Sequence, residues 1–423
     1  MARKMKDSGI EWIGEIPEGW EVIKAKYLFA QRNEKGNSAL VLLSPTQKYG
    51  VIPQSQLEGV VQVKENTDLR VFKTIHIGDF VISLRSFQGG FEFSNYEGVC
   101  SPAYQVFHAT KDLSNDFFRY LFKSDGFISK INSLTVGIRE GKNIQYWDFS
   151  NMLLALPPKE VQIRSAQYLS AKCTEIDTML SKTRSSIEEY KKLKQAVITQ
   201  AVTKGVRGER EMKDSGVAWI GEIPAEWSKC HLKNISSEIG DGLHGTPNFD
   251  DNGDVFFING NNLGGEYVEP RADTKRINSE EFLKYTRPFF SNQTIMISLN
   301  GSYGKVSLYK NFPMLLGKSA GYITLLPSID CRYIKYYLSS TPSQIMMTLS
   351  LNGTTIPNLS LNTLRNFSIF LPVLCEQKEI ADYLDAKCAE IDKLIAKKEQ
   401  LVKELESYKK SLIYEVVTGK REV

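Results

Sequence analysis

The sequence repeats itself over most of its length, and this internal repeat limits the possible fold more than any other feature. The segment MKDSGIEWIGEIPEGW at residues 5–20 returns as MKDSGVAWIGEIPAEW at residues 212–227, with 12 of 16 positions identical at an offset of 207. A second segment, QIRSAQYLSAKCTEID from Gln162, returns as QKEIADYLDAKCAEID from Gln377, with 10 of 16 positions identical at an offset of 215. Two matches in the same order at nearly the same offset indicate a tandem duplication with a period of about 210 residues.

The sequence between these constant segments has diverged. Residues 28–155 and 235–370 align only loosely, through short matches such as FVISL at 80–84 and IMISL at 295–299. The order is therefore a constant segment, a variable domain and a constant segment, twice over. Constant segments favour one shared partner or scaffold, and variable domains favour two different targets. Ordinary divergence after duplication is the alternative interpretation.

Each repeat ends in a segment that predicts a long helix. Residues 160–203 and 376–418 contain neither proline nor glycine. Prolines stand shortly before both segments, and Gly205 and Gly419 follow them, as is typical of helix limits. At 1.5 Å per residue, about 40 residues make a helix on the order of 60 Å long.

Both predicted helices carry an apolar stripe at the 3–4 spacing of a coiled coil, with eight of ten positions apolar in each. Two seams of equal length in one chain most simply pack on each other. The alternative is that each helix lies on its own globular domain. The residues for which we predict helix–helix packing are Leu169, Ile176, Leu180, Ile187, Leu384, Ile391, Ile395 and Leu405.

The junction between the two repeats resembles the two chain ends joined together. Residues 202–213 are similar to residues 417–422 followed by residues 3–6. This similarity predicts a pseudo-two-fold molecule with antiparallel helices and with its chain ends close in space.

The variable domains contain short β-like runs separated by Gly, Asn and Asp, followed by short helical patterns. We therefore predict an α+β fold in which two pseudo-two-fold-related α/β domains are separated by two long antiparallel coiled-coil helices. The predicted boundaries are 1–158 for the first domain, 159–206 for the first long helix, 207–373 for the second domain and 374–423 for the second long helix.

The composition excludes several classes of protein. The 423 residues are 42% hydrophobic and 24% charged, which is typical of folded domains and not of disordered chains. The chain has no apolar run of the roughly 18–20 residues that a membrane span needs, and its start lacks the apolar part of a secretion signal. We therefore predict a cytoplasmic protein with no membrane contact. The net charge of +4 is too small for binding nucleic acid through charge alone.

The loops of the variable domains are rich in side chains that suit nucleic acid. Arg, Lys, Asn and Gln have geometries that match base edges, while Ser, Thr and backbone amides suit phosphates. The turn-forming loops of any enzyme have a similar composition, so this signal is weak by itself. The candidate DNA-binding residues are Arg85, Gln88, Arg139, Lys142 and Asn143 in the first domain, and His244, Asn300, Tyr303, Lys305, Thr354, Thr355 and Asn358 in the second.

The motifs that could carry chemistry fail on inspection. The G-x-G-x-x-G match at residues 240–245 is followed by Thr-Pro-Asn and an acidic turn, so it predicts a loop and not a dinucleotide site. Gly317-Lys318-Ser319 lacks the upstream glycine of a phosphate-binding loop. The six cysteines include no C-x-x-C pair, and no Asn-Pro-Pro-aromatic methyltransferase segment occurs. We predict no catalytic residue, no metal site and no cofactor held by this chain.

The constant segments resemble those of a known family, the specificity subunits of Type I restriction-modification systems. The resemblance covers nearly the whole chain. Three features carry it: the opening at Asp7–Trp20 with its copy at Asp214–Trp227, the domain-ending segments at Leu156–Asp177 and Leu371–Asp392, and the alternation of two variable domains with two long helices. The chain departs from the family pattern at Val373, where a second proline is usual, and at Val161, where Glu is usual.

The resemblance implies a non-enzymatic subunit that reads double-stranded DNA. Each variable domain would be a target-recognition domain for one half of a bipartite site, and the helices would set the spacer between the halves. It also implies two methyltransferase (modification) subunits docked on the helices, which bring S-adenosylmethionine, and restriction-translocase subunits that join the same core.

Two other interpretations of the sequence are possible. The chain could be a scaffold that carries two ligand-binding domains on a coiled coil and does not bind DNA. It could also be a self-contained methyltransferase or nuclease, although the missing methyltransferase motif counts against this. Sequence-specific retention on DNA together with a methyltransferase partner would exclude the scaffold, and tight binding of S-adenosylmethionine by the isolated chain would favour the enzyme.

The Arg139→Ala variant tests the predicted DNA contacts. If Arg139 reads a base, the substitution weakens binding to the cognate site by roughly 1–3 kcal/mol and relaxes specificity at one position. A titration of matched and mismatched duplexes measures both effects. A uniform loss across sequences that shrinks with added salt would instead identify a phosphate contact.

Overall fold

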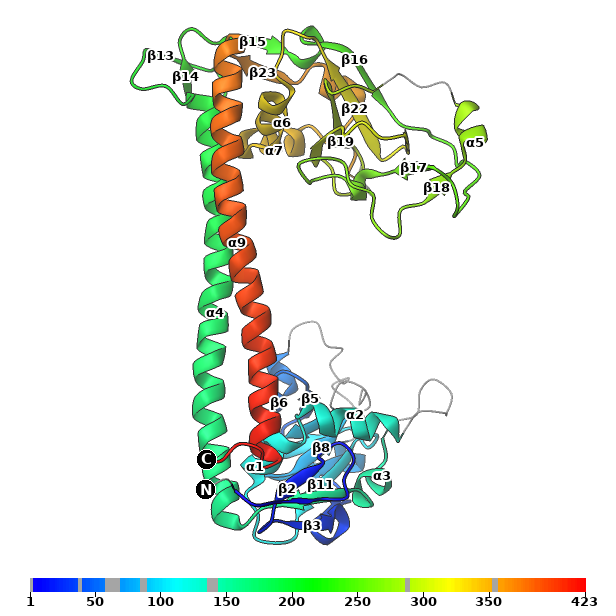
Figure 1. The fold of residues 1–423 in the computed structure, drawn as a ribbon, viewed down its shortest axis with the longest axis vertical. Helices are drawn as coiled ribbons and strands as arrows, with labels where there is room; N and C mark the ends of the chain where they lie inside the picture. Colours follow the sequence, from blue (N-terminus) through cyan, green and yellow to red (C-terminus); the bar gives the residue numbers. More distant parts are fainter. Residues whose placement is uncertain are drawn as a thin grey trace. The chain divides into compact units, whose positions relative to one another are not determined.

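The chain divides into two structural units. The computed structural model describes residues 3–36, 40–57, 69–83, 90–134, 144–285, 290–351 and 357–423. Unit 1 comprises Met1–Arg184 and Gln400–Val423, and unit 2 comprises Ser185–Glu399. Each unit therefore contains one variable domain and a part of both long helices, as the colours of Figure 1 show.

In unit 1, the constant segment comes first and is followed by a four-stranded antiparallel sheet with strand order β4-β11-β8-β9. The constant segment forms the hairpin of β1 (Met5–Asp7) and β2 (Glu15–Pro17), and β3 (Glu21–Lys24) then pairs with β12 (Leu153–Leu156). The sheet strands are β4 (Phe29–Arg32), β8 (Phe80–Ile82), β9 (Phe91–Phe93) and β11 (Gln105–Ala109). The smaller strand pairs are β5 (Leu43–Thr46) with β6 (Gly50–Pro53) and β7 (Lys73–Ile75) with β10 (Gly98–Cys100). The helices are α1 (Asn115–Leu121), α2 (Asp125–Ser133) and α3 (Tyr146–Ser150), with short 3-10 turns at Ala25–Tyr27, Gln54–Gln56 and Leu69–Val71.

The core of unit 1 is built from phenylalanine rings. Phe107 packs on Phe149 with ring centroids 4.9 Å apart, and Phe29 packs edge-on against Phe118 at 5.1 Å. Such close aromatic pairs combine a large buried apolar area with a preferred ring geometry. The same cluster includes residues of both long helices, so the sheet and the helices share one core. The buried phenylalanines are Phe29, Phe80, Phe91, Phe107, Phe117, Phe118, Phe122, Phe127 and Phe149.

Unit 2 repeats the plan of unit 1 and adds a second sheet. Its four-stranded sheet has the order β16-β22-β19-β20, which matches β4-β11-β8-β9 strand for strand. The sheet strands are β16 (Ser236–Asp241), β19 (Thr294–Ser298), β20 (Val306–Leu308) and β22 (Ala320–Leu325). The constant segment forms the pair of β13 (Met212–Asp214) and β14 (Glu222–Pro224), and β15 (Ser228–His231) pairs with β23 (Ser368–Leu371). The additional sheet consists of β17 (Val255–Ile258), β18 (Arg276–Ile277) and β21 (Met314–Leu316). The helices are α5 (Ser279–Leu283), α6 (Cys331–Ser339), α7 (Thr341–Leu349) and α8 (Leu361–Arg365), with 3-10 turns at Leu232–Asn234 and Gly260–Asn262.

The long helices α4 (Lys159–Lys204) and α9 (Leu374–Val417) pack antiparallel in each unit. In unit 1 the Nζ atom of Lys409 lies 2.6 Å and 2.7 Å from the two carboxylate oxygens of Asp177, and in unit 2 Lys194 contacts Asp392 at the same two distances. Both members of the second pair are 215 residues from their counterparts in the first, so one ion pair is made twice. The predicted α+β fold with two long antiparallel helices is confirmed.

All eight residues predicted for helix–helix packing are buried or half-buried. Leu169, Ile176 and Leu180 are buried in the phenylalanine core of unit 1. The half-buried Leu405 packs against the same core. In unit 2, the buried members of the seam are Ile187, Leu384 and Ile391, whereas Ile395 is half-buried.

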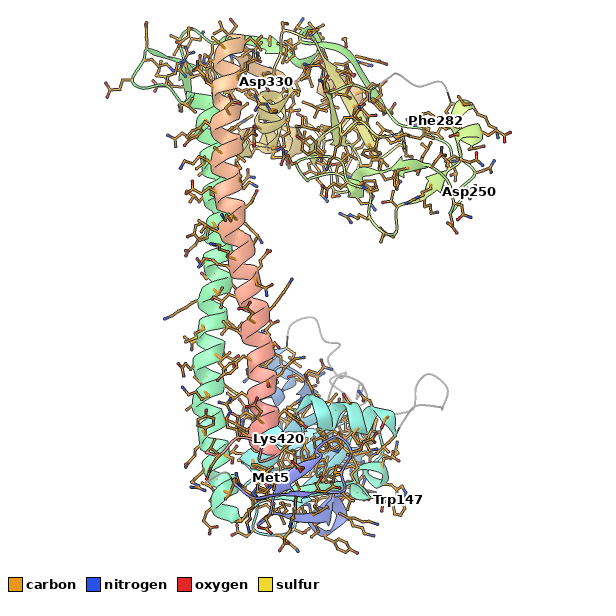
Figure 2. All side chains as sticks on the ribbon, viewed as in Figure 1. Met5, Trp147, Asp250, Phe282, Asp330 and Lys420 are labelled. Carbon is orange, nitrogen blue, oxygen red and sulfur yellow. The ribbon has the colours of Figure 1, made fainter. Side chains whose placement is uncertain are left out.

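A buried glutamine fastens the start of each long helix to its domain. The side chain of Gln162 accepts a hydrogen bond from the backbone N–H of Ser114 at 2.9 Å and donates one to the Pro157 carbonyl at 2.8 Å. Gln377 makes the same two bonds, at 2.9 Å and 2.8 Å, to Asp330 at the start of α6 (Figure 2) and to the Pro372 carbonyl. This amide therefore bridges the entry to the helix and the entry to a domain helix in both units.

In the part of the chain that the structure describes, none of the helices combines the length and the apolar character needed to cross a membrane.

We predict that Gln162→Ala and Gln377→Ala each destabilise the chain by about 2 kcal/mol, because each leaves a backbone N–H and a carbonyl without their partner in a buried site. Urea unfolding of the full chain measures the loss. Gln167→Ala is the matched control because Gln167 is an exposed glutamine on the same helix. Equal stability of Gln162→Ala and Gln167→Ala would contradict the bridging role.

Candidate DNA interface

Four loops of unit 2 meet at one end of the sheet β16-β22-β19-β20. At this end β16 and β19 finish, and β20 and β22 begin. We call it the loop end and define it by residues 242–246, 299–305, 317–319 and 357–360. Five of the second-domain residues predicted from the sequence lie in these segments: His244, Asn300, Tyr303, Lys305 and Asn358.

The loop 299–305 is a tight turn that the sequence specifies. Ser298 closes it, because its backbone N–H donates to the Lys305 carbonyl and its Oγ atom accepts from the Lys305 N–H, both at 2.9 Å. Gly301 and Gly304 have φ values of 70° and 73°, a region in which glycine has no steric penalty. The Asn-Gly-Ser-Tyr-Gly-Lys run therefore holds Asn300 and Tyr303 in fixed positions.

Asn300 and Asn358 lie side by side although 57 residues separate them. The two residues form an isolated antiparallel bridge, and the Leu359 N–H donates to the Leu299 carbonyl at 2.9 Å. The side-chain amide of Asn300 also donates to the Lys318 carbonyl at 3.2 Å. Two amide side chains and an exposed lysine thus come together from three separate loops.

His244 stands on the neighbouring loop. Its Nε2 atom lies 2.7 Å from Oδ2 of Asp241 at the end of β16, and its side chain is 73% exposed. The Leu243 N–H donates to the Leu316 carbonyl at 2.7 Å, which joins this loop to the one that carries Lys318. The backbone passes so close at Gly242 that an added Cβ atom would lie 2.3 Å from the Gly317 carbonyl oxygen, which explains the glycine.

The side chains of Tyr303 and Lys305, in the same turn, contact other parts of their own domain. The Tyr303 hydroxyl pairs with Oγ1 of Thr348 on α7 at 3.2 Å, and the Lys305 side chain passes over Gly264. Both side chains are half-buried. They hold the turn against its own domain, whereas His244, Asn300 and Asn358 border the loop end.

Unit 1 has the backbone hydrogen bond that corresponds to the Ser298–Lys305 bond. The Ser83 N–H donates to the Gly90 carbonyl at 2.7 Å, and these residues lie 215 positions before Ser298 and Lys305. Arg85 and Gln88 lie between Ser83 and Gly90 in the sequence and outside the described residues, as do Arg139, Lys142, Asn143, Thr354 and Thr355.

Glutamines that the sequence analysis did not select occupy the loop end of unit 1. The Gln31 amide donates to the Gln105 side chain at 2.5 Å, and the Gln105 amide lies 3.4 Å from the Gln145 side-chain oxygen. Gln105 pairs with Ile82 at the end of β8, and Gln145 lies just before α3. Because Gln31 and Gln105 are strand residues, a search restricted to loops could not find them.

Lys318 is a further residue that the sequence analysis did not select. It belongs to the Gly317-Lys318-Ser319 turn, which we examined only as a fragment of a phosphate-binding loop. The useful signal was simpler, since a lysine stood in a short turn directly before a predicted strand.

The surroundings of five cysteine thiols disfavour their ionisation. Burial raises the pKa of the Cys100 thiol to about 12. Burial also raises the pKa values of Cys173, Cys230, Cys331 and Cys388, and a thiol with a raised pKa is a poor nucleophile. Among the residues that the structure describes, no group of three or more His, Cys, Asp or Glu side chains could hold a metal ion.

The sequence and the fold are similar to those of one group of known proteins. The sequence model of a family described as "Type I restriction modification DNA specificity domain" matches residues 224–404. The chain is 26% identical over 422 residues to the Type I restriction enzyme MjaVIII specificity subunit of Methanocaldococcus jannaschii, and the alignment covers 96% of this chain and 93% of that protein.

Two solved structures show the same fold. One, described as the structural basis underlying complex assembly and conformational transition of the type I R-M system, contains a chain with a TM-score of 0.73 and 17% identity, covering 96% of this chain and 99% of that one. The HsdS subunit from Thermoanaerobacter tengcongensis has a TM-score of 0.54 and 16% identity, covering 96% of this chain and 98% of that one. The repeated constant segments, the strand order and the paired helices of this chain thus occur together with one consistent set of similarities. In sequence the chain is similar to the DNA specificity subunits of Type I restriction-modification systems over nearly its whole length, and its fold is that of the solved chains.

Proposed function

We propose that each unit reads one half of a bipartite, asymmetric site in double-stranded DNA, through its loop end. The observation that carries this proposal is the equivalence of the two loop ends. Both units have the same strand order and the same backbone hydrogen bond from a serine, Ser83 or Ser298, yet they present different side chains at this end. One scaffold with two sets of contacts suits two different half-sites.

The side chains of the second loop end suit separate tasks in DNA recognition. The amides of Asn300 and Asn358 have the donor and acceptor geometry that matches the N6 and N7 edge of adenine in the major groove. The exposed ammonium group of Lys318 suits a phosphate, which sets position but carries no sequence information. His244, paired with Asp241, borders the same surface.

The long helices suit the role of a spacer between the half-sites. α4 has 46 residues and starts in unit 1 and ends in unit 2, and at 1.5 Å per residue it is about 69 Å long. A turn of duplex DNA is about 34 Å, so a helix of this length corresponds to roughly two turns. The antiparallel partner α9 stiffens α4 through the apolar seam and the repeated ion pair.

The similarity to Type I specificity subunits also suggests the protein partners of this chain. We infer that the helices dock two methyltransferase subunits, which bring S-adenosylmethionine and modify adenine, and that restriction-translocase subunits join this core. The repeat supports two equivalent docking positions, since each unit presents the start of one helix and the end of the other. A subunit that partners clamp onto DNA can be only mildly basic, in agreement with its net charge of +4.

The proposed function predicts the form of the methylated site. Coexpression of the chain with its methyltransferase subunit, followed by genome-wide mapping of N6-methyladenine, is expected to give one motif of two unlike halves separated by a fixed spacer. A palindromic motif would contradict the proposal that the units read different half-sites. Methylation without any sequence preference would contradict DNA specificity altogether.

Substitutions at the second loop end separate base contacts from phosphate contacts. Asn300→Ala and Asn358→Ala are expected to relax the half-site read by unit 2 and to weaken cognate binding by roughly 1–3 kcal/mol, with the other half-site unchanged. Lys318→Ala is expected to weaken binding to all sequences and to lower the salt slope by about 0.9. Salt titrations of the reconstituted complex on matched and mismatched duplexes measure these effects.

Lys310→Ala is the matched control for Lys318→Ala. Lys310 is an exposed lysine that follows β20 at the opposite end of the sheet. If both substitutions change the salt slope equally, the loop end is not the DNA-facing surface of unit 2.

A further inference from the structure

Because the constant segment occurs twice, its burial in unit 1 can be compared with its burial in unit 2. The constant segments 5–20 and 212–227 are nearly identical in sequence, so they should bury the same side chains. Two neighbouring positions differ in burial. Ile13 is 2% exposed in unit 1, whereas its counterpart Ile220 is only half-buried. Trp12 is half-buried, whereas its counterpart Trp219 is 42% exposed.

A tyrosine of α9 covers the constant segment in unit 1. The Tyr414 hydroxyl donates to the carbonyl oxygens of Trp12 and Ile13, at 3.1 Å and 3.4 Å. Its ring lies close to Gly126, where an added Cβ atom would be 3.3 Å from the ring and 2.6 Å from the Trp12 ring. Burial raises the pKa of the Tyr414 phenol, as expected of a ring packed inside a unit.

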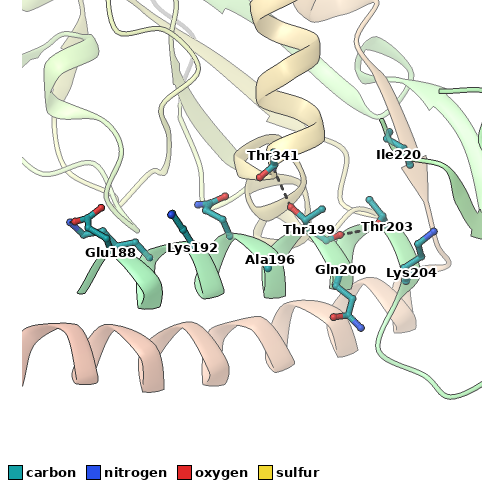
Figure 3. Close-up of a pocket in the computed structure, with 11 residues that line it drawn as sticks. Glu188, Lys192, Ala196, Thr199, Gln200, Thr203, Lys204, Ile220 and Thr341 are labelled. Atoms are coloured by element: carbon teal, nitrogen blue, oxygen red, sulfur yellow. Dashed lines mark hydrogen bonds and ion pairs between the residues drawn. The ribbon is translucent and has the colours of Figure 1, made fainter. Parts of the chain in front are cut away.

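The corresponding position in unit 2 is the much smaller Thr199, 215 residues earlier. Its hydroxyl accepts a hydrogen bond from the Thr341 N–H at 3.3 Å (Figure 3). Among the described residues, no side chain donates to the carbonyl oxygens of Trp219 and Ile220. The space that Tyr414 fills in unit 1 is part of a groove of about 730 Å³ here, bordered by α4, Thr341 and Ile220.

Polar and charged residues of α4 line most of the groove, and their carbon atoms, together with Ala196 and Ile220, give it a largely apolar exposed surface with a basic rim. Lys191, Lys192 and Lys204 border it, and Glu188 is the only carboxylate among its lining residues. Glu188 is paired with Lys191 at 2.9 Å, and Lys204 donates to the Glu222 carbonyl, as Lys420 does to the Glu15 carbonyl in unit 1. The remaining charge at the rim is positive and favours carboxylates on whatever occupies the groove.

From this comparison we infer that the groove is a socket for an aromatic side chain, flanked by carboxylates, of the methyltransferase subunit. The ring takes the place that Tyr414 takes in unit 1, and a phenol hydroxyl there donates to the carbonyl oxygens of Trp219 and Ile220. Aromatic anchors in well-packed pockets supply much of the energy of protein interfaces. The inference rests on the proposed function, which assigns methyltransferase docking to the helices, and it makes the two docking positions unequal.

DNA is the competing occupant, since the rim is basic. The groove itself argues against it, because its exposed surface is largely made of carbon atoms and because the carbonyl oxygens of Trp219 and Ile220 repel phosphates. The experiment below separates the two.

Thr199→Tyr supplies the missing ring from within the chain. We expect it to raise the melting temperature, because it covers Trp219 and Ile220, and to weaken binding of the purified methyltransferase subunit at least ten-fold. Lys191→Glu with Lys192→Glu is expected to weaken the same binding by repelling the carboxylates. Thr178→Tyr, which places the same ring at an exposed threonine of α4, is the control and is expected to bind as wild type does.

The outcomes are distinguishable. If Thr199→Tyr binds the methyltransferase subunit with wild-type affinity, the inference is overturned while the proposed function stands. If Thr199→Tyr does not fold, the charge-reversed variant decides by the same measurement. Charge reversal that lowers DNA affinity and leaves assembly intact shows a DNA contact and overturns the inference. If the wild-type chain itself does not assemble with the subunit, the proposed function and the inference fail together.

Discussion

The antiparallel pairing of two repeat-related helices is the constraint on which the rest of the structure depends. A helix with one apolar stripe cannot remain stable in water unless it buries that stripe. In unit 1 the start of α4 and the end of α9 complete the phenylalanine core, and in unit 2 the end of α4 and the start of α9 complete the other core. The Lys409–Asp177 and Lys194–Asp392 pairs are exposed, so they add little stability. They instead fix the register, because a shift of one helix would separate both pairs.

The constant segments connect these helices to the variable domains. Gln162 and Gln377 are each 2% exposed, and a buried amide that loses its partners cannot regain them from water. Their bonds fix the direction in which each helix leaves its domain. The variable domains, and their surface loops above all, can therefore differ between the units without loss of the helix junction. The difference between Tyr414 and Thr199 shows that even the constant surfaces need not be used in the same way.

Much of the candidate site could be located from the sequence, but its composition could not. Asn300 and Asn358 were selected as residues of two separate loops, and an isolated bridge between the two residues brings those loops together. Tyr303 shared their composition but is used to hold the turn on α7. Lys318 and the glutamines of unit 1 were missed, because their positions follow from strand pairing between residues far apart in the chain.

The sequence by itself determined the duplication, the limits of the long helices and the antiparallel order of their seams. Residues 160–203 were predicted to be helical and α4 spans Lys159–Lys204, because helix periodicity, proline and glycine are local signals. Only the tertiary structure decided which loops meet, which polar seam residues pair and where the groove beside Thr199 opens. Those features depend on contacts between residues that are distant in sequence. Such contacts leave no periodic pattern in the sequence, because they form only when an element packs against others in the folded chain.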